Sequence, residues 1–179
     1  LRSDTVTRPC TNMRRFMSRA KVGDDVYGED PTIESLEKET AGLLGKEASI
    51  FAPSGTQSNL MGILTHCTRG DEYIVGNQAH TFRYEGGGAA VLGGVQPNPL
   101  PMKTNGTVPI DLIAEAIKPE DVHFARTRLI CLENTFAGHP LPIEYAGRVK
   151  KICAAHNLAL HLDGARLFNA AISLSASAK

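Results

Sequence analysis

The sequence lacks an excess of charge of either sign. Its 179 residues include 19 lysines and arginines and 19 aspartates and glutamates, so the formal net charge is zero. A protein that attracts nucleic acid or an anionic membrane through its overall field carries a basic surplus. We therefore expect neither nucleic acid nor a membrane as a partner. The one local basic cluster has the spacing of a solvated helix face and comprises Arg14, Arg15, Arg19 and Lys21.

Paired cysteines, a hydrophobic leader and a long apolar run are missing too. The four cysteines form no C-x-x-C pair, and Cys131 and Cys153 sit in apolar periodic segments, where buried free thiols are usual. The chain is polar from its second residue, unlike a signal peptide, and no apolar run reaches the ~20 residues of a membrane helix. These features predict a cytoplasmic protein. Because Leu1 is not a methionine, we expect the start shown to be trimmed or processed.

Several short catalytic motifs are also absent. The segment 42–46 (GLLGK) has the wrong spacing for a phosphate-binding P-loop, and 86–94 does not give G-x-G-x-x-G after a strand. Neither H-E-x-x-H nor G-x-S-x-G occurs, which argues against a zinc protease and a serine hydrolase. Cys153 and His156 are spaced as a helical pair, but two ligands are too few for zinc. We expect no metal.

Short apolar runs alternate with helical patterns from residue 48 onward. Strands are predicted at 48–52, 72–75, 129–132 and 158–162. Helices are predicted at 56–66, from 81 into the glycines at 86–88, at 111–117 with Asp111 as its cap, and at 143–155. This alternation predicts an α/β fold, a mostly parallel sheet with helices on both faces. The segment 93–106 most resembles a linker.

Residues 1–47 precede this pattern and contain two helical stretches, at 12–20 and 32–44. The second opens with Asp30 as a cap and Pro31 in the first turn. We therefore expect two parts, an N-terminal helical arm over 1–47 and part of an α/β domain over 48–179.

Two segments have the composition of a ligand site. The loop 53–59 (PSGTQSN) follows an apolar run and opens a helix, so its N–H groups favour an anion such as phosphate, although an ordinary helix cap is equally consistent with it. Asp163 ends an apolar strand, where open α/β sheets bind ligands, but an Asp-Gly turn alone also explains it. Among the six histidines, His80 and His123 lie near strands in positions suited to a site.

Taken together, the segments resemble the L-threonine aldolases, pyridoxal-phosphate (PLP) lyases with the aspartate-aminotransferase-like fold. The matching segments are 1–9 (LRSDTVTRP), 22–32 (VGDDVYGEDPT), 53–60 (PSGTQSNL), 66–76 (HCTRGDEYIVG), 80–93 (HTFRYEGGGAAVLG), 118–129 (KPEDVHFARTRL), 131–135 (CLENT) and 158–170 (LALHLDGARLFNA). The resemblance implies the large domain of that fold, incomplete at its C-terminus, with an active-site loop in the N-terminal arm.

The resemblance also implies roles for particular residues. Gly55 and Thr56 correspond to the loop that binds the cofactor phosphate, His80 to the histidine stacked on the pyridine ring, and Asp163 to the carboxylate that keeps the ring nitrogen protonated. His80 and His123 flank the substrate hydroxyl, and an imidazole suits proton transfer there. The expected ligands of the substrate and cofactor further include Ser3, Tyr27 and Arg166.

The implied activity is cleavage of L-threonine or L-allo-threonine, a small β-hydroxy amino acid, to glycine and acetaldehyde. The family likeness implies a homotetramer with active sites at a dimer interface, which Tyr27 would line. Other PLP lyases or racemases of β-hydroxy amino acids remain open, and so does a non-catalytic fragment.

Two departures from the family pattern stand out. Phe136 and Ala137 occupy the positions of the family's His and Asn in an ENTHNG-like segment. The lysine that binds the cofactor lies downstream of the D-G-A-R segment, and the sequence ends before it. The lysines present all look solvated and are Lys21, Lys38, Lys46, Lys103, Lys118, Lys150, Lys151 and Lys179. We therefore expect the chain to be the N-terminal part of a longer enzyme and the 179 residues alone to be inactive.

Overall fold

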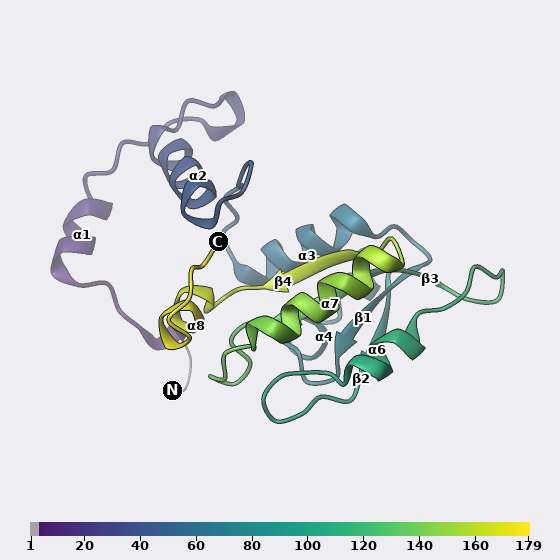
Figure 1. Cartoon of the computed structure of the whole chain (residues 1–179). Coiled ribbons are helices and arrows are strands. Elements are labelled where there is room, and N and C mark those ends of the chain that lie inside the picture. The colour runs from purple at the N-terminus through teal and green to yellow at the C-terminus, as the bar shows by residue number, and fades with distance from the viewer. Residues whose placement is uncertain (1–3) are drawn as a thin grey trace. The chain divides into compact units, whose positions relative to one another are not determined.

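The computed structural model describes residues 4–179 (Figure 1). The chain divides into two compact units. Unit 1 extends to Pro53 and includes Ser177–Lys179, and unit 2 comprises Ser54–Ala176. The predicted division after residue 47 stays a prediction about the domains of the whole protein.

Unit 1 is helical. It contains the 3-10 turns η1 (Asp4–Val6) and η2 (Asp25–Tyr27) and the helices α1 (Thr11–Met17) and α2 (Pro31–Leu44). The start of α2 confirms the predicted cap, because the Asp30 carboxylate accepts hydrogen bonds from the N–H groups of Thr32 and Ile33, at 2.9 and 3.0 Å. These backbone donors also lower the pKa of Asp30.

The strand predicted over residues 48–52 is wrong. The segment runs outside any helix or strand, and its side chains include the exposed Ile50 and Phe51. Its polar contacts run instead to Glu37 on α2: the Ser49 hydroxyl donates to the Glu37 carbonyl oxygen and the Phe51 N–H to the Glu37 carboxylate, each at 2.6 Å. An apolar run becomes a strand only where a neighbouring strand supplies a ladder.

Unit 2 is built on a four-stranded sheet. Its strands are β1 (Asp71–Gly76), β2 (Gln96–Leu100), β3 (Arg126–Glu133) and β4 (Ala159–Asp163), all parallel and ordered β2-β1-β3-β4. This confirms the predicted parallel sheet. The linker prediction at 93–106 missed β2, whose sequence QPNPL contains two prolines. Proline cannot donate to a ladder, which fits the position of β2 at an edge of the described sheet.

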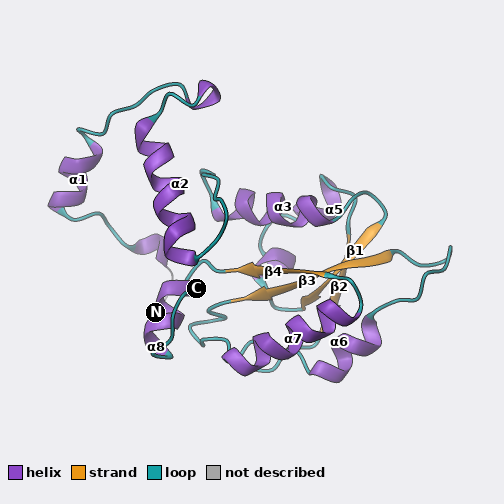
Figure 2. Ribbon diagram, turned by 45° about the horizontal axis from the view of Figure 1, so that its top comes forward, coloured by secondary structure: helices purple, strands orange, loops and turns teal. Residues whose placement is uncertain are grey.

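Helices cover both faces of the sheet (Figure 2). On one face lie α3 (Gly55–His66) and α5 (Gly88–Val91), and on the other lie α6 (Ile110–Ala116) and α7 (Ile143–Ala155). Alternate strand residues supply the two halves of the core: Tyr73 and Leu129 pack with the first pair of helices, and Ile74 and Ile130 with the second. Unit 2 is therefore a three-layer α/β structure.

The shorter elements differ from the predicted boundaries. The helix expected from residue 81 is only α4 (His80–Arg83), because the glycines after it break the helix and α5 begins at Gly88. Asp111 lies in the first turn of α6, whose N-cap is Pro109. α8 (Leu167–Ser173) was not predicted.

Two further predictions concern cysteines and membranes. Cys131 and Cys153 are buried free thiols, as predicted, and Cys67 is buried as well. None of the helices over residues 4–179 has the length and apolar character needed to cross a membrane.

Candidate active site

The polar residues of unit 2 gather where the parallel strands end. β3 ends at Glu133 and β4 at Asp163, which are partners in the ladder. Asp163 is 7% exposed, and its carboxylate accepts hydrogen bonds from the Ala165 N–H at 3.1 Å and the Asn59 Nδ2 at 3.0 Å. A fixed negative charge thus lies at the sheet edge where open α/β folds bind their ligands.

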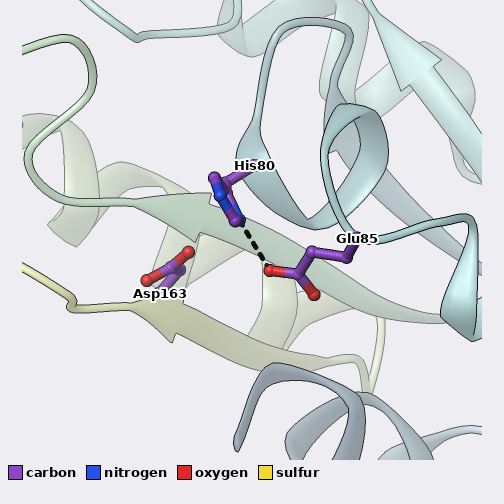
Figure 3. A group of neighbouring side chains, drawn as sticks. All are labelled: His80, Glu85 and Asp163. Carbon is purple, nitrogen blue, oxygen red and sulfur yellow. Dashed lines mark hydrogen bonds and ion pairs between the residues drawn. The ribbon is translucent and has the colours of Figure 1, made fainter. Parts of the chain in front are cut away.

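His80 lies beside Asp163. It begins α4, and its backbone N–H donates to the Glu133 carboxylate at 2.8 Å. Its ring Nδ1 is 2.8 Å from Oε1 of Glu85, and its ring centroid is 5.6 Å from that of Tyr84. Figure 3 shows the imidazole and the carboxylates of Glu85 and Asp163 grouped together. The nearest nitrogen and oxygen atoms of the three side chains lie within 4.8 Å of one another. These three side chains also have the spacing of metal ligands.

Arg166 and Glu133 form a second pair at this edge. The Arg166 guanidinium lies 3.2 Å from the Glu133 carboxylate and donates to the Thr135 carbonyl oxygen at 2.9 Å. Burial raises the pKa of Glu133, and the nearby Asp163 acts in the same direction, while the His80 N–H and Arg166 oppose them. Arg166, which we expected to bind the substrate, is therefore already paired with the Glu133 carboxylate.

The start of α3 offers donors for an anion. The Ser54 hydroxyl caps the helix by accepting from the Gln57 N–H at 3.2 Å. The N–H groups of Gly55 and Thr56 find no acceptor among residues 4–179, and a Cβ at Gly55 would meet no atom within 4 Å. Because Asn59 follows Gly55 by four residues, about 6 Å of helix rise separates the anion donors from the Asp163 contact. Free N–H donors and a buried carboxylate, linked through one turn of α3, have the charges that suit a cofactor with a phosphate and a cationic ring.

Of the expected site residues in unit 2, His123 lies apart from this group. His123 lies in the loop between α6 and β3, and its ring contacts Asp121 at 2.6 Å. This loop leads into the amino end of β3 (Figure 1). β3 runs from Arg126, three residues after His123, to Glu133, and its eight residues span roughly 23 Å. Tyr27 belongs to unit 1 and its side chain is exposed. Ser3 lies outside the described residues.

Four residues at the site received no role from the sequence: Asn59, Glu85, Glu133 and His161. All of them touch one another or His80 and Asp163 through hydrogen bonds. Asn59 and Asp163 are 104 positions apart in the chain, so no periodicity could pair them. The only signal was that all four lie inside segments that carry the family resemblance.

The departure at Phe136 and Ala137 falls in a tight turn. The backbones of Phe136 and His139 exchange two hydrogen bonds, at 3.0 and 2.7 Å, around Ala137 and Gly138. Both central residues have positive φ, 46° and 85°, as in the hairpin turn that favours Asn-Gly. Alanine is strained at the first position, where the resemblance places the family's asparagine.

We expect Ala137→Asn to raise stability by about 1 kcal/mol, the cost of keeping an L-residue other than Asn in this conformation. Thermal unfolding of the full-length protein measures it. Ala137→Val is the matched control and should lower the midpoint, because a β-branched side chain disfavours positive φ. An Asn variant no more stable than the parent would contradict this account of the turn.

The chain belongs to the beta-eliminating lyase family, whose model matches residues 1–179. It is 54% identical over 179 residues to the low specificity L-threonine aldolase of Escherichia coli K12, covering 100% of this chain and 54% of that protein. It is 49% identical over 185 residues to the probable low-specificity L-threonine aldolase 2 of Arabidopsis thaliana, with 100% and 52% covered.

A solved structure also resembles this chain. The threonine aldolase of Leishmania major superposes with a TM-score of 0.75 at 25% identity, over 89% of this chain and 46% of that one. The predicted aspartate-aminotransferase-like fold class is thereby confirmed. The chain spans about half the length of the curated relatives that it matches.

Proposed function

We propose that the full-length protein is a PLP-dependent lyase that cleaves L-threonine and L-allo-threonine to glycine and acetaldehyde. The observation that carries the proposal is the 54% identity, over the whole chain, with a low specificity L-threonine aldolase. The site adds the chemistry that such a reaction needs, since His80 and the buried Asp163 lie within reach of one ligand.

Residues of unit 2 would hold the cofactor. The N–H groups of Gly55 and Thr56 would bind its phosphate, the His80 ring would cover its pyridine ring, and Asp163 would accept the hydrogen of the ring nitrogen. When bound, PLP supplies an electron sink for the bond between Cα and Cβ of the substrate. The Asp163 carboxylate supports that role because its negative charge keeps the ring nitrogen protonated.

His80 is the proposed base for the substrate β-hydroxyl. Its side chain is about half exposed, 46%, so the ring is accessible from the site. It would take the hydroxyl proton as the bond between Cα and Cβ breaks and the aldehyde leaves. Arg166 would bind the substrate carboxylate, in a position shared with Glu133.

A second copy of the chain is part of the proposal. His123 sits at the opposite end of β3 from His80, so it could reach a substrate held by His80 only from another subunit. We propose a homo-oligomer, a tetramer by likeness to the family, with active sites at a subunit interface that Tyr27 and Ser3 would also line. We expect it in the cytoplasm.

The test is product analysis with the full-length protein. We expect L-threonine and L-allo-threonine each to yield glycine and acetaldehyde in equal amounts. A racemase acting on β-hydroxy amino acids would instead form the D-isomer without acetaldehyde. Preference for an aromatic substrate such as phenylserine, with little turnover of threonine, would favour another lyase of this class over the proposed activity.

A further inference from the structure

Asn59 occupies the centre of a buried hydrogen-bond network. It is 6% exposed on α3, and each of its polar atoms has a partner. Nδ2 donates to Oε1 of Glu85 at 2.8 Å and to Oδ2 of Asp163 at 3.0 Å, and Oδ1 lies 3.0 Å from Nε2 of His161. One amide therefore links two buried carboxylates that come from separate segments of the chain.

The partners fix the orientation of this amide. Carboxylates only accept hydrogen bonds, so the NH2 group faces Glu85 and Asp163, and the reversed amide would set its oxygen against both. The Asn59 oxygen then needs a donor, which makes His161 carry its hydrogen on Nε2. Burial lowers the pKa of His161, which keeps this ring neutral.

Glu85 connects the Asn59 network to His80. Its side chain is 5% exposed, and the same Oε1 that accepts from Asn59 is 2.8 Å from Nδ1 of His80. Because that oxygen accepts, the His80 hydrogen sits on Nδ1. In a neutral imidazole Nε2 is then the bare nitrogen, free to take a proton.

We propose that Glu85, held in place by Asn59, is a positioning residue that fixes the His80 tautomer with its hydrogen on Nδ1 and leaves Nε2 as the proton acceptor. This inference rests on the proposed function, in which His80 is the base for the substrate hydroxyl. It adds a residue that acts through His80.

Two reactions of the PLP-loaded, full-length protein separate positioning from a structural role. Cleavage of L-threonine needs a base at the β-hydroxyl, whereas exchange of a glycine α-hydrogen for deuterium from heavy water does not. We expect Glu85→Ala to lower kcat for cleavage about 100-fold, the low end for losing an acid–base group, while glycine exchange changes less than about threefold. Loss of both activities to the same degree would overturn the proposal.

Conservative and control variants sharpen the test. Glu85→Gln keeps an acceptor, oriented by Asn59 toward Nδ1, so it should cleave faster than Glu85→Ala; an equally slow Gln variant contradicts the proposal. Asn59→Leu should slow both reactions, because Asn59 also supports Asp163. Glu144→Ala, at an exposed position in the first turn of α7, should leave both reactions unchanged.

The same two reactions separate the proposed function from the positioning role of Glu85. If the unsubstituted protein exchanges glycine hydrogens but cleaves no threonine, the proposed function fails. If the unsubstituted protein cleaves threonine and Glu85→Ala does so equally fast, the positioning role alone fails.

Discussion

Replacing Asp163 by alanine in the full-length protein should reduce threonine cleavage about a thousand-fold, the high end for losing one preorganised electrostatic group. The carboxylate is buried and held by two donors, Asn59 and the Ala165 N–H, so its charge is fixed in place before any ligand binds. Without that charge, the protonated form of the cofactor's ring nitrogen would no longer be stabilised. Steady-state formation of acetaldehyde measures the loss.

Asp163→Asn separates charge from shape. It keeps an oxygen for the Ala165 N–H but carries no negative charge, so we expect it to be nearly as slow as Asp163→Ala. Asp111→Ala, at an exposed position on α6, is the matched control and should retain full activity. Near-normal turnover in either Asp163 variant would remove Asp163 from the electron-sink role.

The second large effect concerns stability. Glu72 on β1 is completely buried, and its carboxylate pairs with the ammonium of Lys118 and accepts from the Thr127 hydroxyl at 2.8 Å. Lys118→Ala would leave this charge buried without its counter-ion. We expect a loss of about 3 kcal/mol, the low end for breaking a buried pair because Lys118 is partly exposed. Thermal unfolding of the full-length protein reports it.

Removing both partners tests the mechanism. The double variant Glu72→Gln with Lys118→Met carries no buried charge, so it should recover most of the lost stability. Lys151→Ala, an exposed lysine on α7, is the matched control and should change little. A Lys118→Ala variant as stable as the parent, or a double variant no better than the single one, would contradict the pairing.

Lys118 also shows where sequence reasoning reached its limit. It was expected to be solvated, yet it pairs with Glu72, 46 positions earlier in the chain. Nothing local marks such a partner, because Glu72 lies on β1 and Lys118 lies between α6 and β3, and only the folded chain brings them together. The same holds for Asn59, whose partners Glu85 and Asp163 are 26 and 104 positions away.

Features that depend only on neighbouring residues in the chain were predicted better. The cap at Asp30 and the full extent of α7 were predicted from residues within a turn or two of one another. The parallel sheet followed from apolar runs between helices, whereas the strand at 48–52 failed because it has no partner strand. For the site, family likeness singled out His80 and Asp163, which lie close together in the structure, and their roles stay predictions.

The most direct test of the central claim is threonine cleavage by the full-length protein before and after PLP is removed and restored. Our account predicts that glycine and acetaldehyde form together, that formation stops when PLP is stripped away, and that it returns when PLP is added back. Cleavage that continues without PLP, or an absence of cleavage by the fully loaded protein, would contradict the account.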